Sequence, residues 1–168
     1  MKNVWWQVAP ILLAILILDD KLPHRMAVWG KVPDIALVGL LFITLRFGPT
    51  VGVWSGFAAG LFMDVATPED LGARALSLSI ACFVIGRSAV HVDVTSIVVQ
   101  LVLILGMGLV DAIIFESVSH LTQPGVAFRM FFGTHLPGIF YTLIVGAVLL
   151  RFVGRQLRPS RAGWRDLR

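Results

Sequence analysis

The amino-acid sequence predicts an all-α membrane protein, a bundle of six transmembrane helices. Of its 168 residues, 57% are hydrophobic and only 14% are charged, whereas about 25% are charged in a typical soluble domain. The hydrophobic residues also come in long blocks that short charged pieces separate. A chain of this length cannot enclose so many apolar blocks in a soluble core, so we expect lipid to cover them.

Each predicted helix is a hydrophobic block bounded by charged residues, glycine or proline. Trp5 and Trp6 open the first block as interface anchors, and Pro33 is a suitable first-turn residue for the second. The six blocks are about 4–18, 34–47, 51–66, 71–89, the segment from after Asp93 or Thr95 to near 121, and 136–153. Residues 1–155 would form one integral membrane domain, and residues 156–168 a basic cytoplasmic tail.

Two segments leave the helix count open. A spanning helix needs about 20 residues, and segment 34–47 offers fewer before Arg46, so a five-helix bundle with a re-entrant second segment is an alternative. Segment 122–137 is apolar, but prolines and glycines interrupt it. It is either an interfacial helix or short lid on the outer leaflet, or an ordinary loop.

The distribution of Lys and Arg predicts the orientation. With six spans and the tail inside, the inner side holds Lys2, Arg46, Arg87 and the tail arginines 151, 155, 158, 161, 165 and 168, while the outer side holds Lys21, Arg25, Lys31, Arg74 and Arg129. Because cytoplasmic loops carry the excess of basic residues, both termini are predicted to be cytoplasmic. The expected anchors on that side are Arg46, Arg87, Arg151 and Arg155.

A stripe of glycines recurs every four residues in the third predicted helix. Gly52, Gly56 and Gly60 form this glycine stripe, and Ser55 and Ala59 widen it. Lipid tails are as apolar as the side chains, so burying apolar side chains between helices stabilises the bundle little. Close van der Waals packing of small residues therefore matters more in a membrane. The stripe therefore predicts a face pressed by another helix, either within this bundle or from a partner protein.

Acidic residues gather at one predicted depth. Asp34 opens the second helix and Asp64 ends the third at the outer face, while Asp111 and Glu116 lie in the outer half of the fifth. Charges in a membrane segment are costly and face a partner or a cavity. Asp34 and Glu116 could serve as a helix cap and an interface anchor, whereas Asp64 and Asp111 point to a polar network or an outward cavity, with Arg74, in the loop after Asp64, as the nearest counter-charge.

The sequence carries no recognisable catalytic, cofactor or metal site. The order of residues around Ser55 does not match a nucleophile elbow. Glu116 and His120 are four residues apart but lack the further ligands of a closed metal site. Cys82 is the single cysteine, so an internal disulfide is excluded. The basic tail is expected to bind anionic membrane lipid and not nucleic acid, because no basic-aromatic module accompanies it.

The stretch from Val32 to Arg87 resembles the MreD family, the rod shape-determining membrane proteins of bacteria. It covers about a third of the chain, and the order of its motifs is what carries the resemblance. These motifs are Pro33-Asp34, Arg46-Phe47-Gly48, the glycine stripe ending at Asp64, Leu71-Gly72 and Gly86-Arg87. The rest of the chain agrees in length and in its basic tail.

The resemblance implies a fold, a role and partners. The fold would be similar to the six-helix substrate-binding subunits of energy-coupling-factor vitamin transporters. The role would be that of a non-enzymatic scaffold in the bacterial inner membrane, within the elongation machinery that builds lateral peptidoglycan. MreC, a single-span protein with a large periplasmic domain, would be the direct partner, and the wider complex would include MreB, RodA and a class B penicillin-binding transpeptidase.

Site roles and two rival functions follow from these expectations. The glycine stripe would pack within the bundle or against the MreC span, and Asp64 with Asp34 or Arg74 would fix the outer helix ends. Asp111 and Glu116 would line the outward cavity. The alternative function is a vitamin-type substrate-binding subunit of a membrane transporter, with Asp64 and Asp111 as ligand contacts. A small intramembrane enzyme would instead need a nucleophile with a base in reach.

Overall fold

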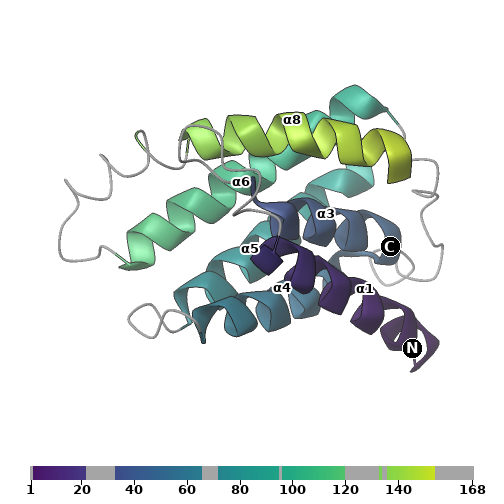
Figure 1. The fold of residues 1–168 in the computed structure, drawn as a ribbon. Coiled ribbons are helices and arrows are strands. Elements are labelled where there is room, and N and C mark those ends of the chain that lie inside the picture. Colours follow the sequence, from purple (N-terminus) through teal and green to yellow (C-terminus); the bar gives the residue numbers. More distant parts are fainter. Residues whose placement is uncertain are drawn as a thin grey trace.

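The computed structural model describes residues 2–21, 33–65, 72–94, 96–119, 133 and 136–153. Within these ranges the chain is all-helical and contains no strand, as the sequence predicts (Figure 1). The helices are α1 (Lys2–Lys21), α3 (Ile35–Phe47), α4 (Pro49–Asp64), α5 (Ala73–Ser88), η2 (Ala89–His91, a 3-10 helix), α6 (Ile97–Ser119) and α8 (Leu136–Val153).

Local sequence explains the turn between α3 and α4. Arg46 lies in the last turn of α3, where a cation is favoured by the helix dipole. Gly48 follows with φ 96° and ψ 166°, a conformation that only glycine adopts without strain. Pro49 then starts α4 at a position whose N–H needs no intrahelical partner. The two helices are thereby joined by a single non-helical residue.

The start of α6 differs from the sequence prediction. The helix begins at Ile97, so Asp93 lies too far ahead to be its N-cap. Instead, the backbone carbonyl of Asp93 accepts a hydrogen bond from the N–H of Ser96 at 3.2 Å, and the Ser96 carbonyl accepts the first helical bond, from Gln100. Thr95, the other residue after which the sequence predicts this helix to start, lies outside the described residues.

Two described helices are long and apolar enough to cross a membrane. They are Ala73–His91 and Ile97–Ser119, while Val4–Asp19, Ile35–Phe47 and Pro137–Leu149 are shorter apolar helices. The 13 residues of α3 extend only about 20 Å, against about 30 Å of hydrocarbon. The short second segment that the sequence predicts is therefore a real feature of the fold.

α3 is the central helix, and its neighbours compensate for its shortness. It packs against α1, α4, α5, α6 and α8, and ten of its thirteen residues are buried. The largest buried side chains of the core include Leu40 and Leu41 of α3 itself, Leu78 of α5, and Ile104 and Met107 of α6. In Figure 1 the first residues of α1 and the last of α8 lie toward the same end of the bundle, at the right of the view.

The outer surface of the bundle is apolar. Large hydrophobic side chains are exposed on α4 (Trp54, Phe62), on α6 (Val98, Val102) and on α8 (Ile144). Soluble proteins rarely expose apolar patches larger than a few hundred Å². A lipid environment favours such an apolar exterior around a buried polar interior.

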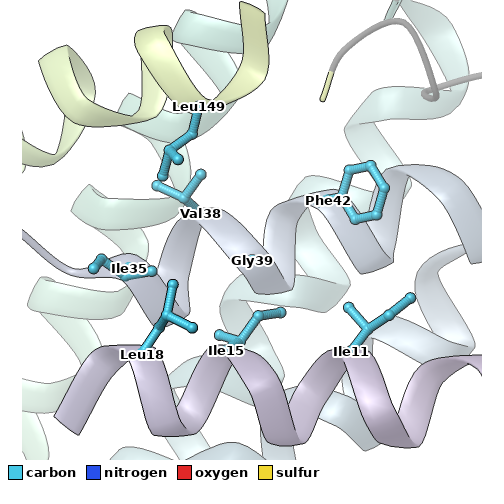
Figure 2. Close-up of a pocket in the computed structure, with 8 residues that line it drawn as sticks. All are labelled: Ile11, Ile15, Leu18, Ile35, Val38, Gly39, Phe42 and Leu149. Atoms are coloured by element: carbon cyan, nitrogen blue, oxygen red, sulfur yellow. The ribbon is translucent and has the colours of Figure 1, made fainter. Parts of the chain in front are cut away.

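The packing of the described helices leaves a gap on this exterior. An apolar groove with a volume of about 230 Å³ runs along α3 between α1 and α8 (Figure 2). The residues that line the groove are Ile11, Ile15, Leu18, Ile35, Val38, Gly39, Phe42 and Leu149.

Candidate functional site

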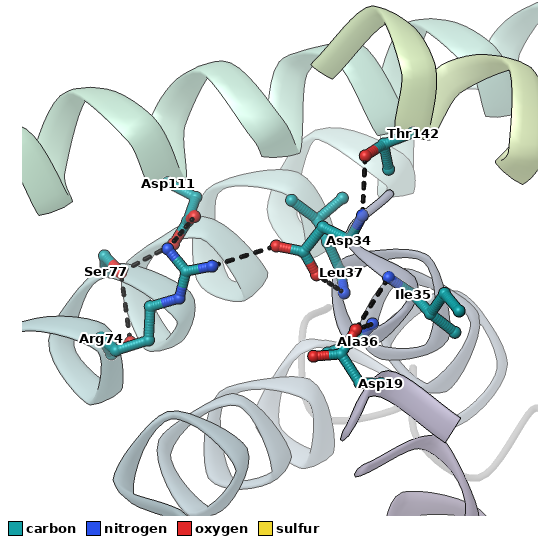
Figure 3. A network of polar contacts seen from close by, with 9 residues as sticks. All are labelled: Asp19, Asp34, Ile35, Ala36, Leu37, Arg74, Ser77, Asp111 and Thr142. Atoms are coloured by element: carbon teal, nitrogen blue, oxygen red, sulfur yellow. Dashed lines mark hydrogen bonds and ion pairs between the residues drawn. The ribbon is translucent and has the colours of Figure 1, made fainter. Parts of the chain in front are cut away.

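A polar network lies at the end of the bundle where α3 and α5 begin. It joins Asp34 at the N-cap of α3, Arg74 in the first turn of α5 and Asp111 of α6 (Figure 3). Asp111 is buried, and Asp34 and Arg74 each keep 23% of their side chains exposed. We call this end of the molecule the network end.

The guanidinium of Arg74 is the centre of the network. Its Nη2 lies 3.1 Å from Oδ2 of Asp34, and its Nη1 lies 3.5 Å from Oδ2 of Asp111. The guanidinium also lies over the Phe115 ring, 5.1 Å from the ring centroid, in a cation–π contact. One side chain from α5 therefore connects α5 to both α3 and α6.

Two hydroxyl groups complete the network. The Ser77 hydroxyl lies 2.7 Å from Oδ1 of Asp111, to which it donates a hydrogen bond, and 3.1 Å from the backbone carbonyl of Arg74. The Thr142 Oγ1 accepts the backbone N–H of Asp34 at 2.9 Å, which attaches α8 to the start of α3. Both hydroxyls are buried.

Asp64 caps the helix that follows its own. Its carboxylate accepts hydrogen bonds from the backbone N–H groups of Gly72 (3.0 Å), Arg74 (3.2 Å) and Ala75 (3.0 Å). Asp64 ends α4, where the helix dipole disfavours an acid, but these bonds place it at the start of α5, where the dipole favours one. The geometry resolves the unfavourable position that the sequence shows.

Asp19 repeats this arrangement between α1 and α3. Its Oδ1 accepts the backbone N–H groups of Ile35 at 3.0 Å and Ala36 at 3.1 Å. Asp34, the N-cap itself, accepts the N–H of Leu37 at 2.7 Å. Two carboxylates thus satisfy the first three N–H groups of α3, which would otherwise lack partners inside a bundle.

The charges of the network are balanced in two different ways. Asp34 and Asp111 face the guanidinium of Arg74, whereas Asp19 and Asp64 face helix N-termini, which carry partial positive charge. An ionised side chain in a membrane segment costs about 2.5–3.5 kcal/mol at the centre of the bilayer on insertion scales. The four carboxylates offset this cost through contacts that all join one helix to another.

The glycine stripe lies inside the molecule. A Cβ atom added at Gly56 would lie 2.9 Å from the backbone oxygen of Leu78, and one added at Gly60 would meet the backbone of Ala75, both in α5. At Gly52 it would meet the Thr44 side chain of α3. Ser55 and Ala59 are also fully buried. The stripe therefore brings the backbones of α4 and α5 together, and these contacts leave it no room for a partner's helix.

The structure places the remaining predicted residues as follows. Arg74 lies in α5 and not in the loop that the sequence predicts. Its guanidinium contacts Asp34 and Asp111, whereas Arg74 donates to Asp64 only through its backbone N–H. Glu116 is buried on α6, five residues beyond Asp111 toward the end of that helix. The groove described above is lined by none of the network residues, and the predicted outward cavity remains a proposal.

The anchors lie at the other end of the bundle or beyond the described part. Arg46 and Arg87 lie in the last turns of α3 and α5, at the end opposite the network. Arg151 belongs to α8, and Arg155 lies outside the described residues. So do the tail 156–168, His120 and most of segment 122–137, so their predicted roles stay predictions.

Sequence reasoning missed three members of the network. Asp19 ends an apolar helix as Asp64 does, so the same argument about the helix dipole would have found it. Ser77 and Thr142 gave no such signal, because hydroxyl groups in apolar helices usually bond to their own backbone. Only the packing of α5 on α6 and of α3 on α8 shows their role.

The chemistry of this network is that of a structural connection. Its carboxylates and its guanidinium contact one another, helix N-termini and hydroxyl groups, and each contact joins separate helices or caps one. Among the described residues no three His, Cys, Asp or Glu side chains gather as they would around a metal ion. The fold and the network together define an all-helical membrane protein whose polar residues hold its helices in place.

Comparison with known families identifies the family to which this chain belongs. The family model described as "rod shape-determining protein MreD" matches residues 1–156 of the 168-residue chain. The chain therefore belongs to the MreD family, a family of membrane proteins with a role in rod shape determination. The resemblance seen in residues 32–87 thus extends over nearly the whole chain.

The other two comparisons add nothing to the fold or the partners. Neither the comparison with curated proteins nor that with solved structures returned a match. The similarity to substrate-binding subunits of energy-coupling-factor transporters therefore remains a prediction, as do the specific partners.

Proposed function

We propose that this chain is a non-enzymatic scaffold of the rod complex in the bacterial inner membrane. In this role it binds an MreC-type single-span protein directly and helps to organise lateral peptidoglycan synthesis with MreB, RodA and a class B penicillin-binding transpeptidase. The observation that carries the proposal is the family match over residues 1–156. Membership gives the role in cell shape, and the structure supports the scaffold.

The polar network supports the scaffold in a physical way. A docking module must keep its helices in a fixed arrangement while a partner binds and leaves. Arg74 connects α5 to α3 and α6, and Thr142 connects α8 to α3, so four helices are held at one end by directional bonds. Such bonds are strong in a medium that offers no water to replace them.

The position of the glycine stripe restricts where the partner can bind. Because α5 and α3 cover Gly52, Gly56 and Gly60, a transmembrane segment of MreC would contact one of the outward faces. These faces carry Phe57 on α4, Val102 on α6 and Ile144 on α8. Their exposed apolar side chains fit either lipid or a partner's helix.

The first experiment is a pull-down of the tagged full chain from its native membrane in mild detergent, analysed for proteins and small molecules. Recovery of an MreC-type protein in constant ratio is the expected result. Recovery of ATPase-type subunits with a bound vitamin-like molecule would replace the proposal with the transporter subunit. Recovery of neither, with the chain intact and folded, would overturn direct MreC binding.

Site-specific photocross-linking then finds the surface. A photoreactive amino acid is placed in turn at Phe57, Val102 and Ile144, with buried Leu41 as the control position. We expect one outward face to cross-link to the MreC-type protein and the control to give no product. Equal products from all three faces would indicate random collisions in the membrane and would contradict a defined interface.

A further inference from the structure

The groove along α3 has no role in the network or in the packing of the glycine stripe. Its walls are aliphatic side chains of α1, α3 and α8, with Phe42 as the one aromatic (Figure 2). Its volume is about 230 Å³, whereas a cavity of about 150 Å³ with similar walls already binds benzene. An α-helix with side chains is about 10–12 Å wide, so the groove accommodates a slender apolar chain and not a helix.

A basic residue lies beyond one end of the groove. On α3 the lining residues Ile35, Val38, Gly39 and Phe42 share one helix face, and the next residue of that face is Arg46. Arg46 lies one turn past Phe42, about 6 Å farther along the axis. A charged group at the end of an apolar groove is the pattern that a lipid with an anionic head would match.

The length of the groove agrees with one leaflet of a bilayer. Ile35 and Arg46 are eleven residues apart, or about 16 Å along a helix, and half of the hydrocarbon thickness is about 15 Å. Val4 and Val8 of α1 pack with Ile43 and Phe47, so the first turns of α1 lie beside the end of α3 that carries Arg46, and Trp5 and Trp6 in those turns are both exposed. Tryptophans of this kind mark the level of the lipid head groups.

We propose that this groove binds one acyl chain of an anionic phospholipid whose phosphate lies at Arg46. The lipid would fill the space that α1 and α8 leave beside α3 and would shield the short central helix from the disordered bilayer. The orientation predicted from the Lys and Arg distribution would place this lipid in the cytoplasmic leaflet. The groove and its charged end do not depend on that orientation or on MreC binding.

Native mass spectrometry of the full chain tests the proposal. The protein is reconstituted in vesicles of equal parts phosphatidylethanolamine and phosphatidylglycerol, extracted in mild detergent and weighed with its bound lipids. We expect one phosphatidylglycerol to remain bound in excess over its share in the vesicles. Bound lipid in the same proportion as the vesicles would overturn the preference for an anionic head.

Two matched pairs of variants test the acyl-chain contact and the head-group contact separately. Leu149→Phe places an aromatic ring in the groove, whereas Val148→Phe places the same ring at the neighbouring exposed position outside it. Arg46→Gln removes the charge at the groove, whereas Arg87→Gln removes a charge of the same kind from the last turn of α5. We expect Leu149→Phe to abolish retention of the lipid and Val148→Phe to leave it unchanged.

The charge variants have a defined expected size. Arg46→Gln should reduce the preference for phosphatidylglycerol about fivefold, which corresponds to about 1 kcal/mol for one basic residue at an anionic surface, while Arg87→Gln should not change it. Helical content and the unfolding midpoint of each variant verify that it folds. Equal lipid retention in Leu149→Phe and Val148→Phe would overturn the proposal. So would a photoreactive amino acid at position 149 that cross-links to a second protein in place of lipid.

Discussion

The helix pairs α1–α3 and α4–α5 are closed at the network end in the same way but pack differently along their length. In each pair an aspartate near the end of the first helix accepts N–H groups from the start of the second, Asp19 for α3 and Asp64 for α5. Beyond that end, glycines press the backbones of α4 and α5 together, whereas branched side chains keep α1 away from α3 and leave the groove.

The difference shows that two properties of a helix–helix interface have separate causes: which helix ends meet, and how closely the helices approach. A carboxylate at a helix N-terminus fixes which ends meet, because it bonds only to N–H groups that the helix leaves unpaired. Small residues fix how closely the helices approach, because van der Waals attraction needs contact. The pair α4–α5 has both an aspartate at the helix N-terminus and a stripe of small residues. The pair α1–α3 has the aspartate, but only Gly39 as a small residue at the contact.

The largest effect is expected from Arg74→Met, which removes the side chain that connects α5 to α3 and α6. Asp34 and Asp111 would lose their counter-charge, and breaking a buried ion pair by removing one partner costs about 3–5 kcal/mol. We expect a loss of that size in the free energy of unfolding, measured in detergent micelles by denaturant titration. Arg87→Met, at the opposite end of α5, should change it little, and equal losses in the two variants would contradict a central role for Arg74.

The same glycine substitution should affect the two pairs unequally. In Gly60→Ala the new Cβ meets the backbone of Ala75, which cannot move without shifting α5, so we expect a cost of about 2–3 kcal/mol. In Gly39→Ala the three atoms nearest to the new Cβ all belong to the side chain of Ile15 and none to a backbone, so a small shift of α1 relieves the contact and the cost should be lower, about 1 kcal/mol. Unfolding midpoints of the two variants measure the difference, and a larger loss at Gly39 would reverse the comparison.

Removal of the two aspartate caps should have a smaller effect that is graded by the number of bonds. Asp64→Ala leaves three N–H groups of the network end without their acceptor, and Asp19→Ala leaves two. We expect losses of about 2 and about 1 kcal/mol, respectively. Hydrogen exchange at the first turns of α5 and α3 would locate each effect. Asp64→Asn keeps an acceptor oxygen and should recover part of the stability, whereas no recovery would indicate that charge alone matters.

A small effect is also expected at Gly72, the N-cap residue of α5. Gly72 has φ +91° with open space around its missing side chain, so Gly72→Ala should cost about 1 kcal/mol through backbone strain alone. Its unfolding midpoint should fall by less than that of Asp64→Ala. A larger fall would show that the turn, and not the carboxylate, is what closes the pair α4–α5.

The sequence determined the helices and the family. Hydrophobic blocks, Pro33-Asp34, Gly48-Pro49 and the glycine stripe are local signals, and they predicted six helices at close to their observed bounds. Such signals suffice because a helix satisfies its own backbone hydrogen bonds whatever surrounds it. The motifs of residues 32–87 also indicated the MreD family, which the match over residues 1–156 confirms.

Only the tertiary structure decided which residues meet. That Arg74 faces Asp34 and Asp111, that Asp19 caps α3, and that the glycine stripe lies against α5 and α3 all depend on how the helices rotate and approach one another. A hydrophobic block in lipid gives little information on rotation, because its apolar residues face bilayer and core alike. Directional bonds among a few buried polar groups, and contact between small residues, supply the information that the apolar pattern lacks.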